Sequence, residues 1–506
     1  MKLLGGIAAI TAAVLVCSAH IGSPDVWYDG NAGPYHLLVQ VVAPSVVPGV
    51  AKVIAHIDGN DVQQVSVQAN RYDAIAVAPP AEIATPVEGS PGTYATSLWI
   101  MEGGSNSVTV NVAGGRGAAK AVIPVVVVAN RRLEFDPRLG ATLTAVGLFL
   151  FVGLVTIIGA AVRESVLPVG EAPDARRRWK ARTAMGVSAV VLALALFGGS
   201  RWWNSEDATF NDSIYKPLTA TAEIQPTSSG QVLQLRLSDS AWIMRNDSAW
   251  LRSHRSSKWS PLIRDHGKLI HVFMIREPDL RAFAHLHPPT EDTVSFPAIL
   301  PQMPAGRYRV YGDIVHESGF TETVSTTIDL QAATAATNSL TDADDAAHFS
   351  SAEPNGTSAV LEDGSVMTLA RGQALVQGTE APLRFNVTAA DGKPLELEPY
   401  IGMAGHAVVT RDDGSVFVHL HPGGTISMAS QMALTMREPG DSVAGKLGQR
   451  IQASSAMQSS PLSQTGSVSF PYAFPQPGNY HMWVQVKHAG RVLTGAFAIE
   501  VAPAAR

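Results

Sequence analysis

A His-Leu-His-Pro segment occurs twice in this 506-residue sequence and carries its clearest candidate chemistry. Residues i and i+2 of a β-strand point to the same face, so His285 and His287 would project together, as would His419 and His421. Two neighbouring imidazoles on one strand can bind one metal ion, and neutral imidazole suits Cu(II), Zn(II) and Ni(II). The spacing therefore predicts metal binding, with copper as the first choice of ion and zinc as the alternative.

The two segments belong to an internal repeat within residues 220–503. A glycine four residues before a histidine precedes each segment, and a Phe-Pro…Pro…Tyr pattern follows each of them. Aligning these landmarks places four histidines at matching positions of each copy. We predict these eight residues as metal ligands: His271, His285, His287 and His316 in the first copy, and His406, His419, His421 and His488 in the second.

A structural role is the alternative interpretation of the same histidines. A repeat copies structural residues as faithfully as ligands. The His-Leu-His-Pro segment could be a turn in which the imidazoles hydrogen-bond to backbone carbonyls and the proline ends the strand. Cysteine offers no other metal site, because the sequence contains a single cysteine, Cys17, and a thiolate zinc site or iron–sulfur cluster needs several.

Short β-strands must position these side chains. The repeats, 220–332 and 357–503, contain extended segments between turns. Residues 20–136 contain five short runs rich in β-branched residues, separated by Pro-Gly, Asp-Gly and Gly-Gly turns. This pattern is typical of antiparallel sandwiches. We therefore predict a mainly β chain with three immunoglobulin-like antiparallel β-sandwich domains plus two transmembrane helices, in which a flexible Ala/Ser/Thr/Asp-rich linker, 333–356, joins the repeats.

Two apolar runs, 139–162 and 183–200, predict the transmembrane helices. The segment between them, 163–182, contains six basic and three acidic residues, which predicts a cytoplasmic loop. Residues 1–19 are typical of a secretory signal peptide, with which Cys17 is removed unless it is lipidated. We expect a protein of the bacterial cytoplasmic membrane, with the lipid bilayer as a partner and with extracytoplasmic (periplasmic) N-terminal and C-terminal domains.

The composition excludes several classes of function. The formal net charge is −6 and charged residues make up 16% of the chain, so no basic surface for nucleic acid is indicated. The sequence contains no phosphate-binding P-loop, no Gly-x-Ser-x-Gly nucleophile elbow and no His-Glu-x-x-His motif. We therefore expect no nucleic-acid or nucleotide partner and no nucleophilic hydrolase.

Part of the N-terminal region resembles a known family. Residues 90–101 contain a Pro-Gly-x-Tyr segment, and a Gly-x-x-x-Val-x-Val pattern follows at 104–110. These segments resemble the second half of YtkA-like domains. The resemblance implies a small periplasmic β-sandwich of the kind often linked to copper or cytochrome-oxidase assembly.

The second repeat also resembles a domain of bacterial extracytoplasmic proteins near metal-efflux systems. The matching segments are Ala-Gly-His406, the Asp413…His-Leu-His-Pro stretch, and Phe474-Pro-x-Pro-Gly-x-Tyr…Trp483. The resemblance implies a role in metal homeostasis rather than a particular reaction. The first copy departs from it, because Lys-Leu-Ile precedes His271. If one copy alone binds metal, we therefore favour the second.

Three functions follow from these patterns. The first is a non-catalytic, membrane-anchored extracytoplasmic metal-binding protein, with copper favoured, of metal homeostasis or cuproenzyme assembly. The second is a structural or interaction protein that contacts an envelope protein partner and whose histidines are incidental. The third is a cupin-like metalloenzyme, since His285-x-His287 is followed by Glu291. Against the third, Thr425 replaces that glutamate in the second copy, and Arg309 stands where a histidine is required.

Overall fold

The fold is described from a computed structural model of the chain. Contacts divide it into two compact units: Val128–Lys216 forms one, and the residues before and after that segment form the other. The predicted signal peptide, 1–19, lies outside the described residues, as does 333–341 of the predicted linker. The structure describes residues 20–21, 25–72, 79–133, 135–168, 170–228, 230–244, 257–332, 342–370, 372, 374–438, 441, 445–454 and 464–504.

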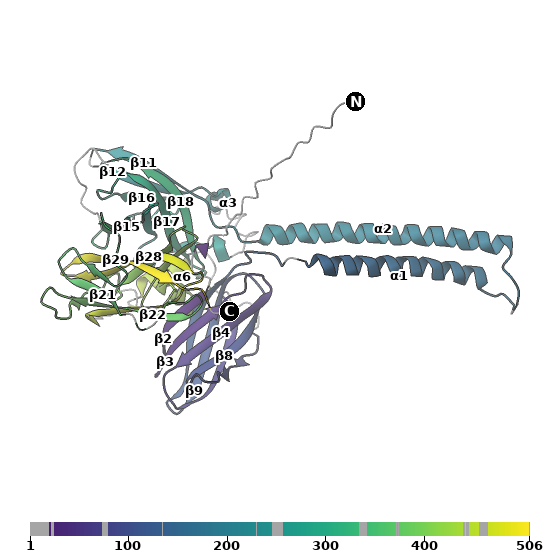
Figure 1. The fold of residues 1–506 in the computed structure, drawn as a ribbon, viewed down its shortest axis with the longest axis horizontal. Coiled ribbons are helices and arrows are strands. Elements are labelled where there is room, and N and C mark those ends of the chain that lie inside the picture. The colour runs from purple at the N-terminus through teal and green to yellow at the C-terminus, as the bar shows by residue number, and fades with distance from the viewer. Residues whose placement is uncertain are drawn as a thin grey trace. The chain divides into compact units, whose positions relative to one another are not determined.

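The N-terminal region forms two antiparallel sheets, several of whose strands are labelled in Figure 1. One apolar core lies between them. Val39 and Val41 of one sheet and Val108 and Val110 of the other are fully buried in that core, as period-two alternation requires. Each of the five runs predicted here coincides with a strand. The first sheet contains β2 (Asp25–Ala32), β3 (Tyr35–Val42), β4 (Gly49–Ile57), β8 (Thr93–Ile100) and β7 (Thr85–Pro86), and the second contains β10 (Gly117–Val127), β9 (Gly104–Gly114), β5 (Val62–Arg71) and β6 (Glu82–Ile83).

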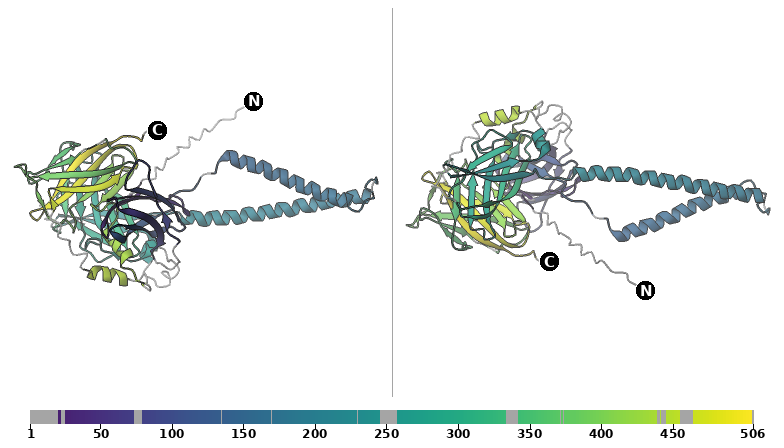
Figure 2. Two further views of the ribbon diagram at one scale, coloured as in Figure 1. Left: turned by 90° about the horizontal axis from the view of Figure 1, so that it is seen from below. Right: turned by 90° about the horizontal axis from the view of Figure 1, so that it is seen from above.

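Two long helices form the second unit, and Figure 2 shows them as the arms of one hairpin. They are α1 (Pro137–Glu164) and α2 (Ala175–Ser213), and both are long and apolar enough to cross a membrane. The predicted loop 163–182 is too long: its basic half is the beginning of α2. Asp174 caps that helix by accepting a hydrogen bond from the Arg177 backbone N–H, and the Ala, Arg and Lys residues that follow favour helix.

The first repeat consists of two antiparallel sheets with an apolar core between them. Strand β19 lies within the predicted linker 333–356 and adds to the sheet edge beside β15, so this part of the linker is an ordered strand. The smaller sheet contains β11 (Ala220–Thr227), β12 (Gly230–Leu237) and β16 (Ser295–Ile299). The larger contains β13 (Leu262–Ile263), β17 (Gly306–His316), β14 (His271–Glu277), β15 (Ala282–Leu286), β19 (Ala346–Phe349) and β18 (Thr321–Leu330); the short helices α3 (Ser240–Met244) and η1 (Ser257–Trp259) lie between β12 and β13 in the sequence.

The second repeat has the same strand arrangement around its histidines. Strand β24 (His406–Arg411) lies between β25 (Val416–Leu420) and β28 (Gly478–His488), as β14 lies between β15 and β17. One sheet contains β1 (His20–Ile21), β25 (Val416–Leu420), β24 (His406–Arg411), β28 (Gly478–His488) and β29 (Arg491–Val501). The others contain β20 (Ser358–Val360), β21 (Val366–Ala370), β22 (Glu380–Thr388) and β27 (Ser467–Ala473), and β23 (Glu396–Leu397) with β26 (Gln464–Thr465); the inserted helices are α5 (Met428–Thr435) and α6 (Lys446–Ala453).

The histidine-bearing sheets of the two repeats pack against each other through their outer faces. Along β14, Met274 belongs to the core of the first repeat, whereas Phe273 belongs to a cluster shared by both repeats. In that shared cluster Phe283 stacks on Trp483, with ring centroids 4.8 Å apart, and Tyr311 stacks on Phe417 at 3.8 Å. Each such pair adds about 0.5–1.5 kcal/mol beyond its buried area. Both faces of these sheets are therefore buried.

Candidate metal centre

Seven histidines from both repeats meet beside the shared aromatic cluster. Leu286 and Leu420 point into the cores of their own repeats, so the histidines on either side of each leucine point to the opposite face, as the alternation predicted. The seven residues are His266 in the turn before β14, His271, His285 and His287 on and after β14 and β15, and His406, His419 and His421 on and after β24 and β25. Six of them are buried, and the side chain of His419 is 6% exposed.

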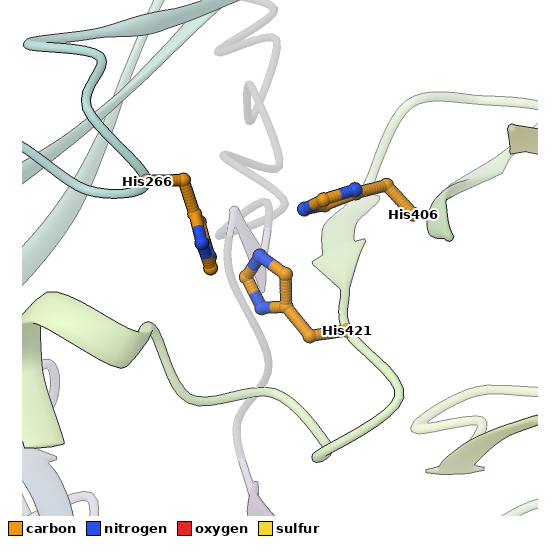
Figure 3. Close-up of side chains that lie close together, drawn as sticks. All are labelled: His266, His406 and His421. Carbon is orange, nitrogen blue, oxygen red and sulfur yellow. The ribbon is translucent and has the colours of Figure 1, made fainter. Parts of the chain in front are cut away.

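The rings form two groups in contact with each other. In one group, ligand atoms of His271, His285 and His287 lie within 4.8 Å of one another. In the other, the same holds for His266, His406 and His421, which Figure 3 shows pointing toward a common centre. His419 lies between the groups. The ring centroid of His419 is 5.4 Å from that of His271 and 5.3 Å from that of His406.

Protein oxygens hold the Nδ1 atom of four of these rings. The Nδ1 atom of His287 is 2.9 Å from a carboxylate oxygen of Asp345, and that of His421 is 3.0 Å from the Ile426 carbonyl oxygen. A partner of this kind fixes the ring orientation and the tautomer, with the proton on Nδ1. The Nε2 atom is then left with a lone pair, which is the form that binds a metal ion.

The other two Nδ1 contacts cross between the repeats. His285 of the first repeat lies 2.8 Å from the Gln485 side-chain oxygen of the second, and His419 of the second lies 3.3 Å from a carboxylate oxygen of Asp313 in the first. Asp313 pairs with the first histidine of β14 as Gln485 pairs with the first histidine of β24, so the two occupy matching positions of the repeat. The repeats therefore orient each other's central histidine reciprocally.

Several ring nitrogens in the cluster have no hydrogen-bond partner among the described residues. A buried polar atom left unsatisfied costs about 1–3 kcal/mol, and folded proteins contain few of them. Here they converge on one place and are all of one chemical type, which is what a shared metal ion would require. The atoms are Nε2 of His266, His271, His287, His419 and His421, and both nitrogens of His406.

Burial keeps five of the cluster imidazoles in the ligand form. Desolvation, reinforced by the neighbouring imidazoles, holds the pKa values of four rings well below the usual 6.5 and lowers that of His266 as well. A neutral imidazole is the species that coordinates a metal. The four rings are those of His271, His285, His406 and His421.

Two of the eight predicted ligands lie away from the cluster. His316 is buried elsewhere in the first repeat, where its Nδ1 atom is 3.0 Å from the Ser260 carbonyl oxygen. His488 is at the end of β28, 2.7 Å from the Glu396 carbonyl oxygen. His316 is three residues beyond Asp313, which faces the cluster. Residues separated by an odd number of positions on a strand point to opposite faces, and three positions span about 10 Å. The His316 side chain therefore points away from the cluster.

His266 is a cluster member that the repeat comparison missed. It occupies a tight turn at φ 51°, and the matching residue of the second repeat, at φ 49°, is Ile401. A search for histidines at matching positions therefore passes over it. One signal in the sequence could have found it: His266 lies only five residues before His271. A tight turn between them can bring both side chains to the same end of the strand.

Three polar residues around the cluster were also missed. Asp345 lies in the predicted linker and accepts hydrogen bonds from both the backbone N–H and the ring of His287. The buried Tyr400 hydroxyl lies 3.1 Å from Nδ1 of His285, and Gln485 contacts the same atom. Glu291, which prompted the cupin comparison, instead forms an ion pair with Arg264 and is largely exposed.

Comparison with known protein families gives a match for one part of the chain. A family described as "Domain of unknown function (DUF8832)" matches residues 358–503, which contain the second repeat. No curated protein matches the chain. Among solved structures, the chain is similar to a tetra-tandem repeat in the extending region of a large adhesion protein, at 10% identity over 91% of this chain and 72% of that one, with a TM-score of 0.16.

Two further solved structures show similar coverage. Escherichia coli alpha-2-macroglobulin activated by porcine elastase is 8% identical over 93% of this chain and 31% of its own, with a TM-score of 0.18. The ICAM-5 D1–D4 ectodomain fragment is 8% identical over 93% of this chain and 77% of its own, with a TM-score of 0.15. At these TM-scores the likenesses carry no functional argument.

Proposed function

We propose that this protein binds copper between its two repeats and serves metal homeostasis or cuproenzyme assembly without catalysing a reaction. One observation carries the proposal: buried imidazoles from both repeats turn toward one another nitrogens that have no hydrogen-bond partner among the described residues. Protein oxygens hold the opposite nitrogen of three of these rings, those of His287, His419 and His421. A water-exposed histidine cluster would need no such orientation. A purely structural cluster would pair these nitrogens instead.

The ligand set favours copper over other ions. It consists of imidazole nitrogens, and the nearby carboxylates of Asp313 and Asp345 are engaged by Nδ1 atoms. Such a set is too poor in oxygen for magnesium or calcium. Among divalent first-row ions, a nitrogen site binds Cu(II) most tightly, and zinc is the alternative because it also accepts imidazole.

The location proposed for this site is the outer face of the bacterial cytoplasmic membrane. Helices α1 and α2 supply the anchor in the bilayer, and the basic start of α2 favours a cytoplasmic position for the helix connection. The N-terminal region and both repeats would then be extracytoplasmic. We assign all three as immunoglobulin-like sandwiches, which the paired antiparallel sheets support at the level of layers.

A metal titration of the full chain in detergent tests the proposal. Cu(I), Cu(II) and Zn(II) would each be titrated by competition with a chelator, using wild type and the double variant His287→Ala/His421→Ala, which removes one ligand from each group. His488→Ala is the matched control, because that ring lies outside the cluster. We expect sub-micromolar copper binding that the double variant loses and the control keeps. Binding weaker than about 1 µM, or binding unchanged in the double variant, overturns the proposal.

An interaction with an envelope protein is a second candidate function, and one surface favours it. On β4 and β8 of the N-terminal region, Val50 and Trp99 are direct cross-strand partners. Trp99 is 66% exposed, and Met101, which follows the end of β8, is 65% exposed. Exposed large apolar side chains that gather on one sheet face often mark a protein contact. The variant Trp99→Ser should abolish capture of such a partner from envelope extracts and leave copper binding unchanged.

A further inference from the structure

We propose that the cluster holds two copper ions rather than one. This inference rests on the proposed metal-binding function and adds its stoichiometry and its arrangement. Each ion would take three imidazoles: one from His271, His285 and His287, and the other from His266, His406 and His421. His419 would lie between the two ions.

The dimensions of the cluster match two ions. Copper and zinc bind imidazole nitrogen at about 2.0–2.1 Å, so the ligand atoms of one ion lie within about 4 Å of one another. Each group of three is close to this size, since its ligand atoms all lie within 4.8 Å of one another, and small rotations of the rings would bring them to bonding distance. Between the groups, the rings of His266 and His271 are 6.4 Å apart, as are those of His285 and His406. A single ion could not take seven imidazoles, and the two groups share no residue.

The two groups differ in how they depend on the fold. The group of His271, His285 and His287 comes entirely from the first repeat, on β14, on β15 and directly after β15. The other group takes His266 from the first repeat and two histidines from the second, so its ion would link the repeats. We therefore expect the second ion to depend more strongly on the packing of both repeats than the first, whose three ligands the second repeat orients only at His285.

His419 has the position of a ligand shared by the two ions. Its ring is nearly equidistant from His271 and His406, one from each group. Its Nδ1 atom lies near Asp313, and its Nε2 atom is buried with no hydrogen-bond partner in the described part of the chain. One nitrogen can complete the coordination of one ion at a time. His419 would therefore add the fourth nitrogen to either ion, which couples the occupancy of the two sites.

The test counts copper per chain in single-group variants. His287→Ala removes a ligand from the first group. His266→Asn removes one from the second, and asparagine tolerates the left-handed backbone at that turn. The full chain in detergent would be loaded with copper, freed of excess ion and analysed for metal and protein. We expect two copper ions per chain for wild type and for His488→Ala, one for each single-group variant, and none for the two combined.

Electron paramagnetic resonance supplies the second measurement. Two neighbouring Cu(II) ions interact through space, so wild type loaded with Cu(II) should give a dipole-broadened spectrum with a half-field transition, and each single-group variant should give the sharper spectrum of one isolated ion. Thermal unfolding of the metal-free variants checks that they fold. One ion in wild type, with either variant abolishing binding, overturns the two-ion inference and leaves the proposed function standing. If wild type binds no copper, both the two-ion inference and the proposed function are overturned.

Discussion

Replacing Trp483 by alanine should separate the contribution of the inter-repeat contact from that of the repeats themselves. Trp483 is 1% exposed and stacks on Phe283 of the other repeat at an interplanar angle of 9°. A buried tryptophan removes about 200 Å² from water, worth about 5 kcal/mol at 25 cal/mol per Å². Because measured Trp-to-Ala costs run at about 3–5 kcal/mol, we expect the free energy of unfolding to fall by about 4 kcal/mol.

The matched control is Phe385→Ala, which removes a fully buried ring from the internal core of the second repeat. Both variants should lower the midpoint of urea unfolding, followed by circular dichroism of the full chain in detergent. Under native conditions they should differ. Trp483→Ala should weaken copper binding at the group of His266, His406 and His421, whereas Phe385→Ala should not. Unchanged copper binding in Trp483→Ala, with stability within about 1 kcal/mol of wild type, would refute this account of the interface.

Three further predictions concern the cluster itself. Asp345→Ala removes the acceptor of the His287 Nδ1 proton and should weaken copper affinity about 10–100-fold in a chelator competition. Copper at 100 times its dissociation constant should stabilise the fold by about 2.7 kcal/mol per ion, seen as a rise in melting temperature that a chelator reverses. In metal-free protein, burial lowers the pKa values of His271, His285, His406 and His421 below the usual 6.5, so the unfolded state binds more protons. Stability should therefore be full above about pH 6.5 and fall below it, by up to about 1.4 kcal/mol per pH unit for each such histidine, and pH-independent melting between pH 7.5 and 5.5 would contradict this.

Local periodicity was enough to predict part of the site. The alternation around Leu286 and Leu420 depends on strand geometry alone, so the same-face projection of each histidine pair could be predicted before the fold was known. The same logic fails for His316, because the repeat alignment matches positions along the chain and does not test which face of the strand they occupy. Asp345 could not be predicted either, since its segment reads as a linker until β19 pairs with β15.

The order of residues in two strands, rather than the overall composition, indicates that the two repeats pack against each other. Strand β14 reads His-Val-Phe-Met-Ile, and β24 reads His-Ala-Val-Val-Thr, with apolar residues at successive rather than alternate positions. Strands buried on one face alternate, whereas strands buried on both faces read as nearly continuous apolar runs. Two such strands at matching positions of a repeat predict that the outer faces of both sheets are buried. The outer face of one repeat can bury that of the other.

Covering those faces turns two half-sites into one shared centre. A repeated domain that packs on its copy makes contacts like those of a two-fold dimer, in which each side supplies what the other needs. The exchange of Asp313 to His419 and Gln485 to His285 has this form. Because both copies lie in one chain, matching positions can also differ, as Asp313 and Gln485 do. His266 opposite Ile401 is the difference that matters most, since it supplies the third imidazole of the inter-repeat group and makes the two halves of the centre unequal.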